Sequence, residues 1–283
     1  MPELPEVEVL VRHLAPALAN RKIEGIEIKR SRIIAPTSVV EFSRRLRGAA
    51  FTQLARRGKY LLFEMKQPDG KTFPLVGHLG MTGRMYVSPR NAPLPKHAAA
   101  VFNLGAENFV FEDTRYFGRL TLDTSAIDAL GPEPLGDGFT IEYFSQALQR
   151  STQPIKVKLL DQQLVAGIGN IYASEALFRA GISPRLAARR LKLPQIERLW
   201  QALRETLSSA IKRGSTIRVD YSGAVLRDGL FYFGTAAEVE KFYEKRLQVY
   251  DRAGKPCVRC GSAVKRIVQG ARSTFYCPKC QCG

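Results

Sequence analysis

The first apolar pattern in the chain has the period of an α-helix. Val7, Leu10, Val11 and Leu14 recur at spacings of three and four residues, which places them on one face of a helix. Pro5 fits the first turn of such a helix, where its missing N–H is not needed. The pattern therefore predicts a helix that starts within a few residues of Met1.

Residues 21–122 carry short apolar runs that alternate with polar residues and are broken by Gly, Pro or Asn. Examples are KIEGIEI, KYLLFEM, FPLVGHL, AVFNL and NFVFED. A period of two predicts strands, and many short strands with turn signals favour a sandwich or a barrel. QPDGK at Gln67–Lys71 is typical of a turn.

The pattern changes after GPEPLGDGF (Gly131–Phe139), a Pro- and Gly-rich stretch that predicts a boundary. Beyond it, helical spacing dominates. The longest helix is predicted over 195–213, with Gly214 as its cap and an apolar stripe of Ile196, Leu199, Trp200, Leu203, Leu207 and Ile211. Shorter helical stretches are predicted at 156–165, 173–180 and 184–191.

Composition adds a strong bias toward a polyanionic partner. The 283 residues include 43 Lys and Arg against 26 Asp and Glu, a formal net charge of +17. A surplus of this size favours nucleic acid first and an anionic membrane surface second, with a charged surface for solubility as the alternative. No apolar run is long enough for a membrane span and no basic leader is present, so a cytosolic or nucleoid-associated protein is expected.

All five cysteines lie at Cys257 or later. Cys257, Cys260, Cys277 and Cys280 have the spacing C-x2-C-x16-C-x2-C, which suits a tetrahedral zinc site with a hairpin between the two pairs. Four thiolates would close the site, so the metal is expected to be structural. Disulfides or free thiols are the alternative, and Cys282 is left over.

Basic residues surround these cysteines. The hairpin is predicted to turn around Gln269-Gly270, which places Arg272 at its tip. There the Arg272 side chain could reach a phosphate or a groove. The alternative is a solvated basic face.

The amino terminus offers a nucleophile. If Met1 is removed, Pro2 carries a free secondary amine, and α-amino groups have a pKa of about 7.7–8.0, so a useful fraction is neutral at pH 7. Attack of this amine on a sugar C1′ would form a cationic iminium that favours elimination, and Glu3 could donate or relay a proton. The alternative is that PELPEVE is only a capped helix start.

Five blocks spread along the chain resemble the bacterial formamidopyrimidine-DNA glycosylases of the Fpg/Nei superfamily. They are PELPEVE, RRGKYLLFEM, HLGMTGRM, GIGNIYASEALFRAGISP and the cysteine module with QGARSTFYC. PELPEVE is closer to this branch than to the endonuclease VIII branch, which usually starts PEGPE.

The resemblance implies a bifunctional, monomeric enzyme of base excision repair. Such an enzyme flips an oxidised purine, such as 8-oxoguanine or a formamidopyrimidine, out of damaged double-stranded DNA, excises it, and nicks the abasic site by β,δ-elimination. The implied fold is α+β and multidomain, with one zinc ion. We expect a β-sandwich with an N-terminal helix at 1–131, a helix-two-turns-helix domain at 132–245 and a zinc-finger hairpin at 246–283.

The resemblance also assigns catalytic roles. Pro2 is the Schiff-base nucleophile and Glu3 the proton donor. Lys59 is the acid and phosphate contact for β-elimination, although alone it would be interpreted as a solvent-exposed lysine at a strand end. Arg272 is the phosphate clamp tied to δ-elimination.

DNA contacts are assigned in the same way. Met81, Arg115 and Phe117 match residues that fill the space left by the flipped base, with core packing as the alternative for Met81 and Phe117. His97 matches a DNA-contacting position. Lys156 is expected to contact a phosphate, with solvent exposure as the alternative, and Asn170, just before a helix, to grip phosphate or to act as an N-cap.

Four departures from the family pattern concern substrate preference. The usual KHDH reads KHAA at Lys96–Ala99, and the usual DPRRFG reads DTRYFG at Asp113–Gly118. Thr152 stands where a basic residue is often found, and segment 222–246, where a lesion-capping loop is expected, is longer than usual. Two other functions therefore stay open: a glycosylase for oxidised pyrimidines, and a zinc-finger DNA-binding protein without catalysis.

Overall fold

The computed structural model describes residues 2–214 and 247–282. These residues form two compact units. The first contains residues 2 and 6–128, and the second contains residues 3–5, 129–214 and 247–282. We describe each unit by itself.

The first unit is the predicted β-sandwich. One antiparallel sheet has the strand order β1 (Gly25–Ile28), β6 (Ala98–Asn103), β7 (Glu107–Asp113), β5 (Gly83–Pro89). The other has the order β2 (Ala50–Arg57), β3 (Tyr60–Lys66), β4 (Thr72–His78), β8 (Arg119–Thr121). The sequence pattern named β1, β3, β4, β6 and β7, and the turn predicted at Gln67–Lys71 is present, with Gly70 at φ +88°.

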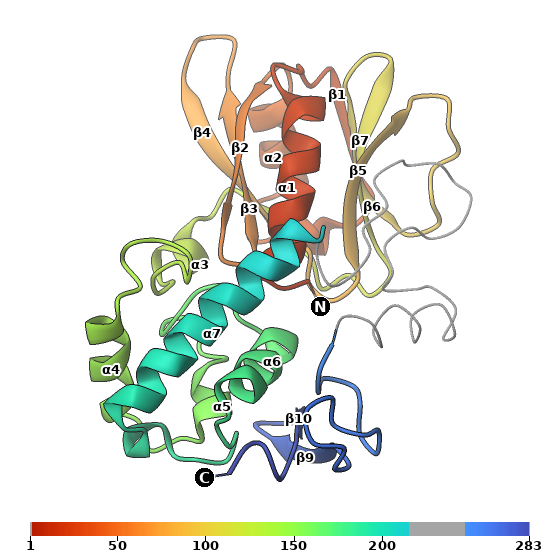
Figure 1. Cartoon of the computed structure of the whole chain (residues 1–283). Coiled ribbons are helices and arrows are strands. Elements are labelled where there is room, and N and C mark those ends of the chain that lie inside the picture. The colour runs from red at the N-terminus through yellow and green to blue at the C-terminus, as the bar shows by residue number, and fades with distance from the viewer. Residues whose placement is uncertain (1, 215–246, 283) are drawn as a thin grey trace. The chain divides into compact units, whose positions relative to one another are not determined.

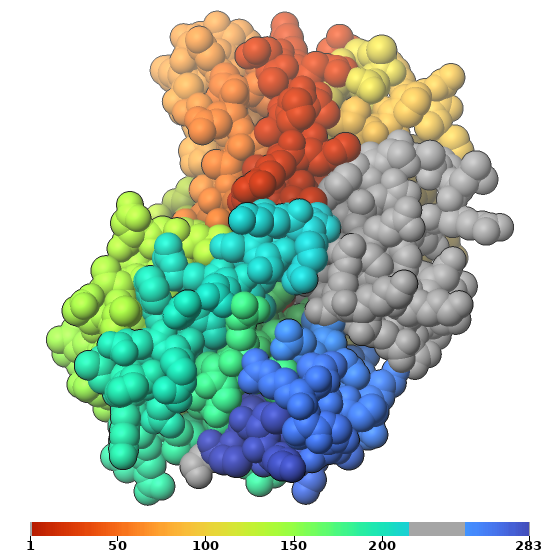
Figure 2. Space-filling view, viewed as in Figure 1, coloured from red at the N-terminus to blue at the C-terminus, as the bar shows by residue number. Residues whose placement is uncertain are grey.

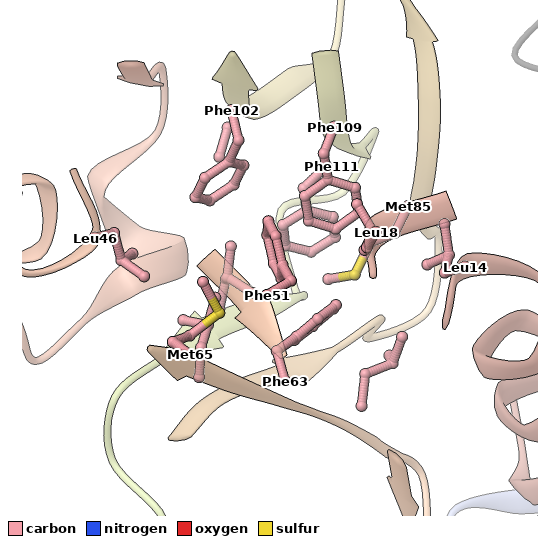
Figure 3. Packing of buried hydrophobic residues seen from close by; sticks show 14 of the residues in the cluster. Leu14, Leu18, Leu46, Phe51, Phe63, Met65, Met85, Phe102, Phe109 and Phe111 are labelled. Atoms are coloured by element: carbon pink, nitrogen blue, oxygen red, sulfur yellow. The ribbon is translucent and has the colours of Figure 1, made fainter. Parts of the chain in front are cut away.

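An aromatic cluster fills the space between the two sheets (Figure 3). Phe109 lies at its centre, and its ring centroid is 5.8 Å from that of Phe51, 5.7 Å from that of Phe63 and 5.5 Å from that of Phe102. Such edge-to-face and tilted pairs add to the free energy gained by burying the rings. The cluster joins strands of both sheets, because Phe51 and Phe63 lie on β2 and β3 and Phe102 and Phe109 on β6 and β7.

Helix α1 (Leu4–Leu18) runs beside the sandwich (Figure 1). The predicted apolar face is correct, because Val7, Leu10, Val11 and Leu14 are all buried in the core of the first unit. The helix begins at Leu4, so Pro5 lies in its first turn as predicted.

One helix of the first unit lies in the segment where the pattern predicted mostly strands. Helix α2 (Val39–Leu46) follows a short 3₁₀ turn (Ser31–Ile34) and buries Phe42 and Leu46. Its N-cap Ser38 accepts a hydrogen bond from the Glu41 N–H at 3.2 Å. A further single-turn helix, α3 (Ser125–Asp128), ends this unit.

The second unit is helical. It contains α4 (Ile141–Gln149), α5 (Ile155–Lys158), α6 (Asn170–Ala180), a 3₁₀ turn (Ala188–Arg190) and α7 (Leu193–Lys212). The long helix is confirmed, and Gly214 follows its C-cap at φ +74°. Of the predicted stripe, Ile196, Leu199, Leu203 and Leu207 are buried, while Trp200 and Ile211 are half-buried.

Two shorter helix predictions were wrong in extent. The helix predicted at 156–165 stops at Lys158, and a turn follows in which the Asp161 carboxylate accepts the Gln163 N–H at 2.9 Å. The segment 184–191 contains only a 3₁₀ turn. The Ile155 N–H donates to the Leu186 carbonyl at 2.7 Å, and the Lys156 N–H donates to the Pro184 carbonyl at 3.4 Å. These carbonyls therefore accept hydrogen bonds from another segment and not from a helix of their own.

The C-terminal module is the predicted hairpin of β9 (Lys265–Gln269) and β10 (Arg272–Tyr276). Gly270 and Ala271 form its two-residue turn, at φ +54° and +57°, one residue later than predicted. Its small core includes Val264 and Phe275 and packs on Phe178 of α6. Figure 2 shows these C-terminal residues in blue against the green helical residues.

No helix in the described residues is long and apolar enough to cross a membrane.

Candidate functional site

The start of helix α6 receives the carboxylate of Glu3. One Glu3 oxygen accepts the Ile171 N–H at 2.9 Å, and the other accepts the Tyr172 N–H at 3.3 Å. These are N–H groups of the first helical turn, which have no partner within the helix. The contact also brings a carboxylate to the positive end of the helix dipole. Glu3 is thereby fixed, and Pro2 is covalently attached to it.

A glycine makes this approach of the chain terminus possible. A Cβ atom on Gly169, the N-cap of α6, would lie 2.3 Å from the Glu3 carboxyl carbon. A side chain at position 169 would therefore displace Glu3 from the helix start. Next to it, the Leu4 N–H donates to the Gly167 carbonyl at 3.0 Å.

Lys156 and Asn170 form a buried pair at the same helix end. The Lys156 side chain is fully buried, and its Nζ donates to Asn170 Oδ1. The Asn170 Nδ2 donates to the Ser273 carbonyl of β10 at 2.9 Å. Asn170 thus ties α6 to the hairpin rather than capping α6, and the alternative of a solvent-exposed Lys156 is wrong.

The surroundings of Lys156 lower its pKa. Burial lowers the pKa of Lys156 to about 8, the Glu3 carboxylate opposes this shift, and the Arg272 guanidinium adds to it. Arg272 is exposed at the start of β10, next to the hairpin turn, as the sequence predicted. The second unit therefore brings Glu3, Lys156, Asn170 and Arg272 to one place.

Glu175, which the sequence analysis did not select, anchors the segment 248–250 that leads into the hairpin module. Its buried carboxylate accepts three backbone hydrogen bonds, from the N–H groups of Gln248 and Val249 at 2.9 Å and of Tyr250 at 2.8 Å. Burial raises the pKa of Glu175, and the three N–H groups oppose that shift. The available signal was one charged residue within the mainly apolar stretch IYASEALF.

The first unit carries a second group of predicted residues, on the two loops around Met81 and Arg115. Arg115 Nη1 lies 3.5 Å from Met81 Sδ, and its Cζ lies 5.1 Å from the centroid of the Phe117 ring. Met81 is 41% exposed and Phe117 is 44% exposed, so core packing is wrong for both. The three predicted void-filling residues thus lie together at the surface.

Asp113 organises these loops from a fully buried position. Its carboxylate accepts hydrogen bonds from the Thr82 hydroxyl, from the Arg115 N–H at 3.1 Å and from the Gly118 N–H at 2.7 Å. The loops also touch directly, because a Cβ on Gly80, which has φ +61°, would lie 2.7 Å from the Gly118 nitrogen. The loop geometry is therefore set before any ligand binds.

His97 and Lys59 occupy defined positions in the same unit. His97 Nδ1 lies 3.3 Å from the Tyr116 hydroxyl. Lys59 follows Gly58 in the turn between β2 and β3 and is only 7% exposed, so the solvent-exposed alternative is wrong. Burial lowers the pKa of His78 to about 4, with Lys59 and Arg119 adding to the shift, and His78 Nδ1 accepts the Gly80 N–H at 3.1 Å.

The four predicted zinc ligands converge. The Sγ atoms of Cys257, Cys260, Cys277 and Cys280 all lie within 4.8 Å of one another. Two of these separations are 3.8 Å and 3.5 Å, close to the edge of about 3.8 Å expected for a sulfur tetrahedron around zinc with Zn–S bonds of about 2.3 Å. The donor set therefore fits one structural zinc ion, and Cys282 stands outside it with its Sγ 3.0 Å from the Lys279 carbonyl.

Comparison with known proteins defines the class first. Residues 1–120 match the formamidopyrimidine-DNA glycosylase N-terminal domain, residues 130–221 match the H2TH domain of the same enzymes, and residues 254–281 match a zinc finger found in FPG and IleRS. This order of a glycosylase domain, a helical domain and a zinc finger is that of a DNA glycosylase.

Individual proteins narrow the class. The formamidopyrimidine-DNA glycosylase of Carboxydothermus hydrogenoformans is 42% identical over 282 residues, which cover 99% of this chain and 100% of the relative. The enzyme of Burkholderia thailandensis is 40% identical over 297 residues, with the same coverage. The chain belongs to the formamidopyrimidine-DNA glycosylase family.

Solved structures agree with this assignment. The Lactococcus lactis enzyme bound non-covalently to DNA with an abasic site has a TM-score of 0.84 at 32% identity and covers 99% of this chain and 100% of its own. A structure of MutM with DNA containing carbocyclic 8-oxo-G has a TM-score of 0.85 at 34% identity, with full coverage of both chains. The predicted multidomain α+β fold is thus confirmed.

Proposed function

We propose that this chain is a bifunctional DNA glycosylase and abasic-site lyase of base excision repair that acts on oxidised purines in double-stranded DNA. The observation that carries the proposal is the cluster at the start of α6. There the Glu3 carboxylate, which is next to Pro2 in the chain, lies close to Lys156. The Asn170 amide and the Arg272 guanidinium of the hairpin lie in the same cluster.

In the proposed reaction, Met1 is absent and the Pro2 amine is the nucleophile. Its nitrogen bonds to C1′ of the damaged nucleotide, and the bond from C1′ to the base nitrogen breaks. The departing base takes up a proton that Glu3 donates or relays. The C1′–O4′ bond then breaks and O4′ takes up the proton that the Pro2 nitrogen loses, which opens the sugar and leaves a cationic iminium at C1′. This iminium draws electrons from C2′, so loss of a C2′ proton expels the 3′ phosphate and a second elimination expels the 5′ phosphate.

Cations of both units support these eliminations in the proposal. Arg272, Lys156 and Asn170 bind the phosphate that flanks the damaged nucleotide, near the N-terminal end of α6, where the helix dipole also favours an anion. Lys59 serves as acid and phosphate contact for β-elimination, and its burial in a tight turn limits its freedom of motion.

The exposed group of the first unit supports base flipping. Met81, Arg115 and Phe117 would enter the gap in the stack, and Arg115 could hydrogen-bond the orphan base. His97 would contact the backbone beside them. The lesion-capping loop predicted at 222–246 lies outside the described residues.

Borohydride trapping tests the proposal. Reduction of the iminium should leave a covalent complex with duplexes that contain 8-oxoguanine or formamidopyrimidine, once mass spectrometry confirms loss of Met1. Trapping on 5-hydroxycytosine alone would favour the oxidised-pyrimidine alternative. Salt-sensitive binding without trapping on any duplex would favour the non-catalytic DNA-binding protein.

The Pro2→Gly variant separates a nucleophile from a helix start. We expect release of the lesion base to slow far more than the affinity for abasic DNA falls. The α-amino group of Gly can carry the same positive charge toward DNA as that of Pro2, but it is a primary amine and lacks the secondary amine of the pyrrolidine ring that acts as the nucleophile. Equal losses in both measurements would contradict the proposed role of Pro2.

The remaining assignments belong to the same proposal. We expect a monomer in the cytoplasm, associated with the nucleoid through its +17 charge. We also propose domain boundaries after residues 131 and 245.

A further inference from the structure

Arg30 lies over the aromatic ring of Tyr116. The Arg30 Cζ is 4.9 Å from the centroid of the ring, and the Tyr116 hydroxyl is 3.3 Å from His97 Nδ1. Tyr116 has φ +52°, an unusual conformation for a non-glycine residue. It is held because Asp113 binds the N–H groups of Arg115 and Gly118 on either side of it. The ring is therefore a fixed platform with one face toward Arg30.

The guanidinium of Arg30 is exposed, and no carboxylate pairs with it among the described residues. Within the part of the chain that the structure describes, Arg30 has no ion pair, and its guanidinium carbon lies over the Tyr116 ring. Planar N–H donors on a stacked guanidinium suit the bidentate binding of a phosphate. The site can therefore accept an anion without first breaking an internal salt bridge.

The position of this cation relates to the departure in DTRYFG. Tyr116 stands where the family pattern DPRRFG has its second arginine, so this loop has one cation fewer. Arg30 comes from a different element, just before the 3₁₀ turn (Ser31–Ile34), and its guanidinium lies over the Tyr116 ring. The next residue of the loop, Phe117, belongs to the exposed group with Met81 and Arg115.

We propose that Arg30 binds a backbone phosphate of the DNA duplex, with Tyr116 as the platform that orients it and His97 as the partner that holds the tyrosine hydroxyl. The proposal rests on the proposed function, because it needs DNA to lie against the loops of Met81 and Arg115. It adds a phosphate contact from residues that are 86 positions apart in the sequence, Arg30 and Tyr116.

The salt dependence of DNA binding tests this contact. Affinity for a duplex with a tetrahydrofuran abasic analogue is measured by fluorescence anisotropy between about 50 and about 200 mM KCl. Loss of one phosphate contact should reduce the slope of log K against log salt by about 0.9 in Arg30→Ala. Arg44→Ala, which removes the same charge from an exposed position on α2, should keep the wild-type slope.

Variants at position 116 test the platform. Tyr116→Phe keeps the ring and should keep the slope, whereas Tyr116→Ala should reduce it as Arg30→Ala does, and combining the two should reduce it no further. Arg30→Ala with Tyr116→Arg should restore the slope, because a guanidinium returns to the loop. If Arg30→Ala melts at a lower temperature than wild type, Tyr116→Ala and the restoring pair carry the test.

Two results would separate the failures. A wild-type protein that neither binds nor is trapped on damaged duplex overturns the proposed function. A wild-type protein that is trapped normally, with an unchanged slope in both Arg30→Ala and Tyr116→Ala, overturns the Arg30 contact alone.

Discussion

The buried Lys156 predicts a loss of DNA affinity at an unusually low pH. Burial lowers its pKa to about 8, whereas an ordinary lysine has a pKa of about 10.4. In the free protein this residue would be about nine-tenths charged at pH 7 and about one-tenth charged at pH 9. The charged groups that face it are the Glu3 carboxylate, which raises the pKa, and the Arg272 guanidinium, which lowers it.

The sign of the effect follows from proton linkage. A bound phosphate stabilises the charged form of Lys156, so DNA binding takes up a proton above pH 8 and the affinity falls as the pH rises. If only the charged form binds, the association constant should fall about tenfold from pH 7 to pH 9. The folded state favours the neutral form of Lys156. Between pH 8 and about 10.4 the unfolded chain therefore binds more protons, and this residue should make the free energy of unfolding increase as the pH rises.

The assay is a titration of the tetrahydrofuran duplex at constant salt and varied pH. This duplex cannot form a Schiff base, so the chemistry of Pro2 does not enter the measurement. Lys156→Arg stays charged and Lys156→Met stays neutral, so the difference between wild type and either variant isolates Lys156. A fall of the same size and midpoint in both variants would refute the reasoning.

Two other predictions concern the module that carries Arg272. Glu175→Ala leaves three N–H groups without their acceptor, which costs about 1–3 kcal/mol each, and removal of a buried carboxylate offsets part of this cost. We therefore expect the free energy of unfolding, measured in urea, to fall by about 3 kcal/mol. A change within about 0.5 kcal/mol would contradict the role of Glu175 as an anchor. Removing the metal with a chelator should weaken binding to abasic DNA and stop nicking, with recovery when zinc is returned, because the hairpin core is too small to fold without it; normal nicking by metal-free protein would contradict it.

The sequence predicted best where one short segment contains the whole signal. The spacing of the four cysteines defined the metal site, and the stripe on the long helix defined α7. A local signal was also overlooked, because the pattern Ser38-x-x-Glu41 marks the start of α2 within a strand-rich region.

Contacts between distant segments could not be derived in this way. The Asn170 side chain bonds to Lys156, 14 residues away, and to the Ser273 carbonyl, 103 residues away. The burial of Lys156, and with it the lowered pKa, exists only after these segments have come together. For the same reason the sequence left core packing open as the alternative for Met81 and Phe117, and only the folded loops show that both side chains are exposed.

The order that Asp113 imposes on its two loops has a kinetic consequence for damage search. A protein that slides along DNA meets each base pair only briefly, and a loop that had to fold at every step would slow the search. Here the carboxylate holds the loops of Met81 and Phe117 in place beforehand, with both side chains already projecting into solvent. If these residues act as the wedge, the time spent at each step would depend on how easily that base pair unstacks, which differs between intact and damaged DNA.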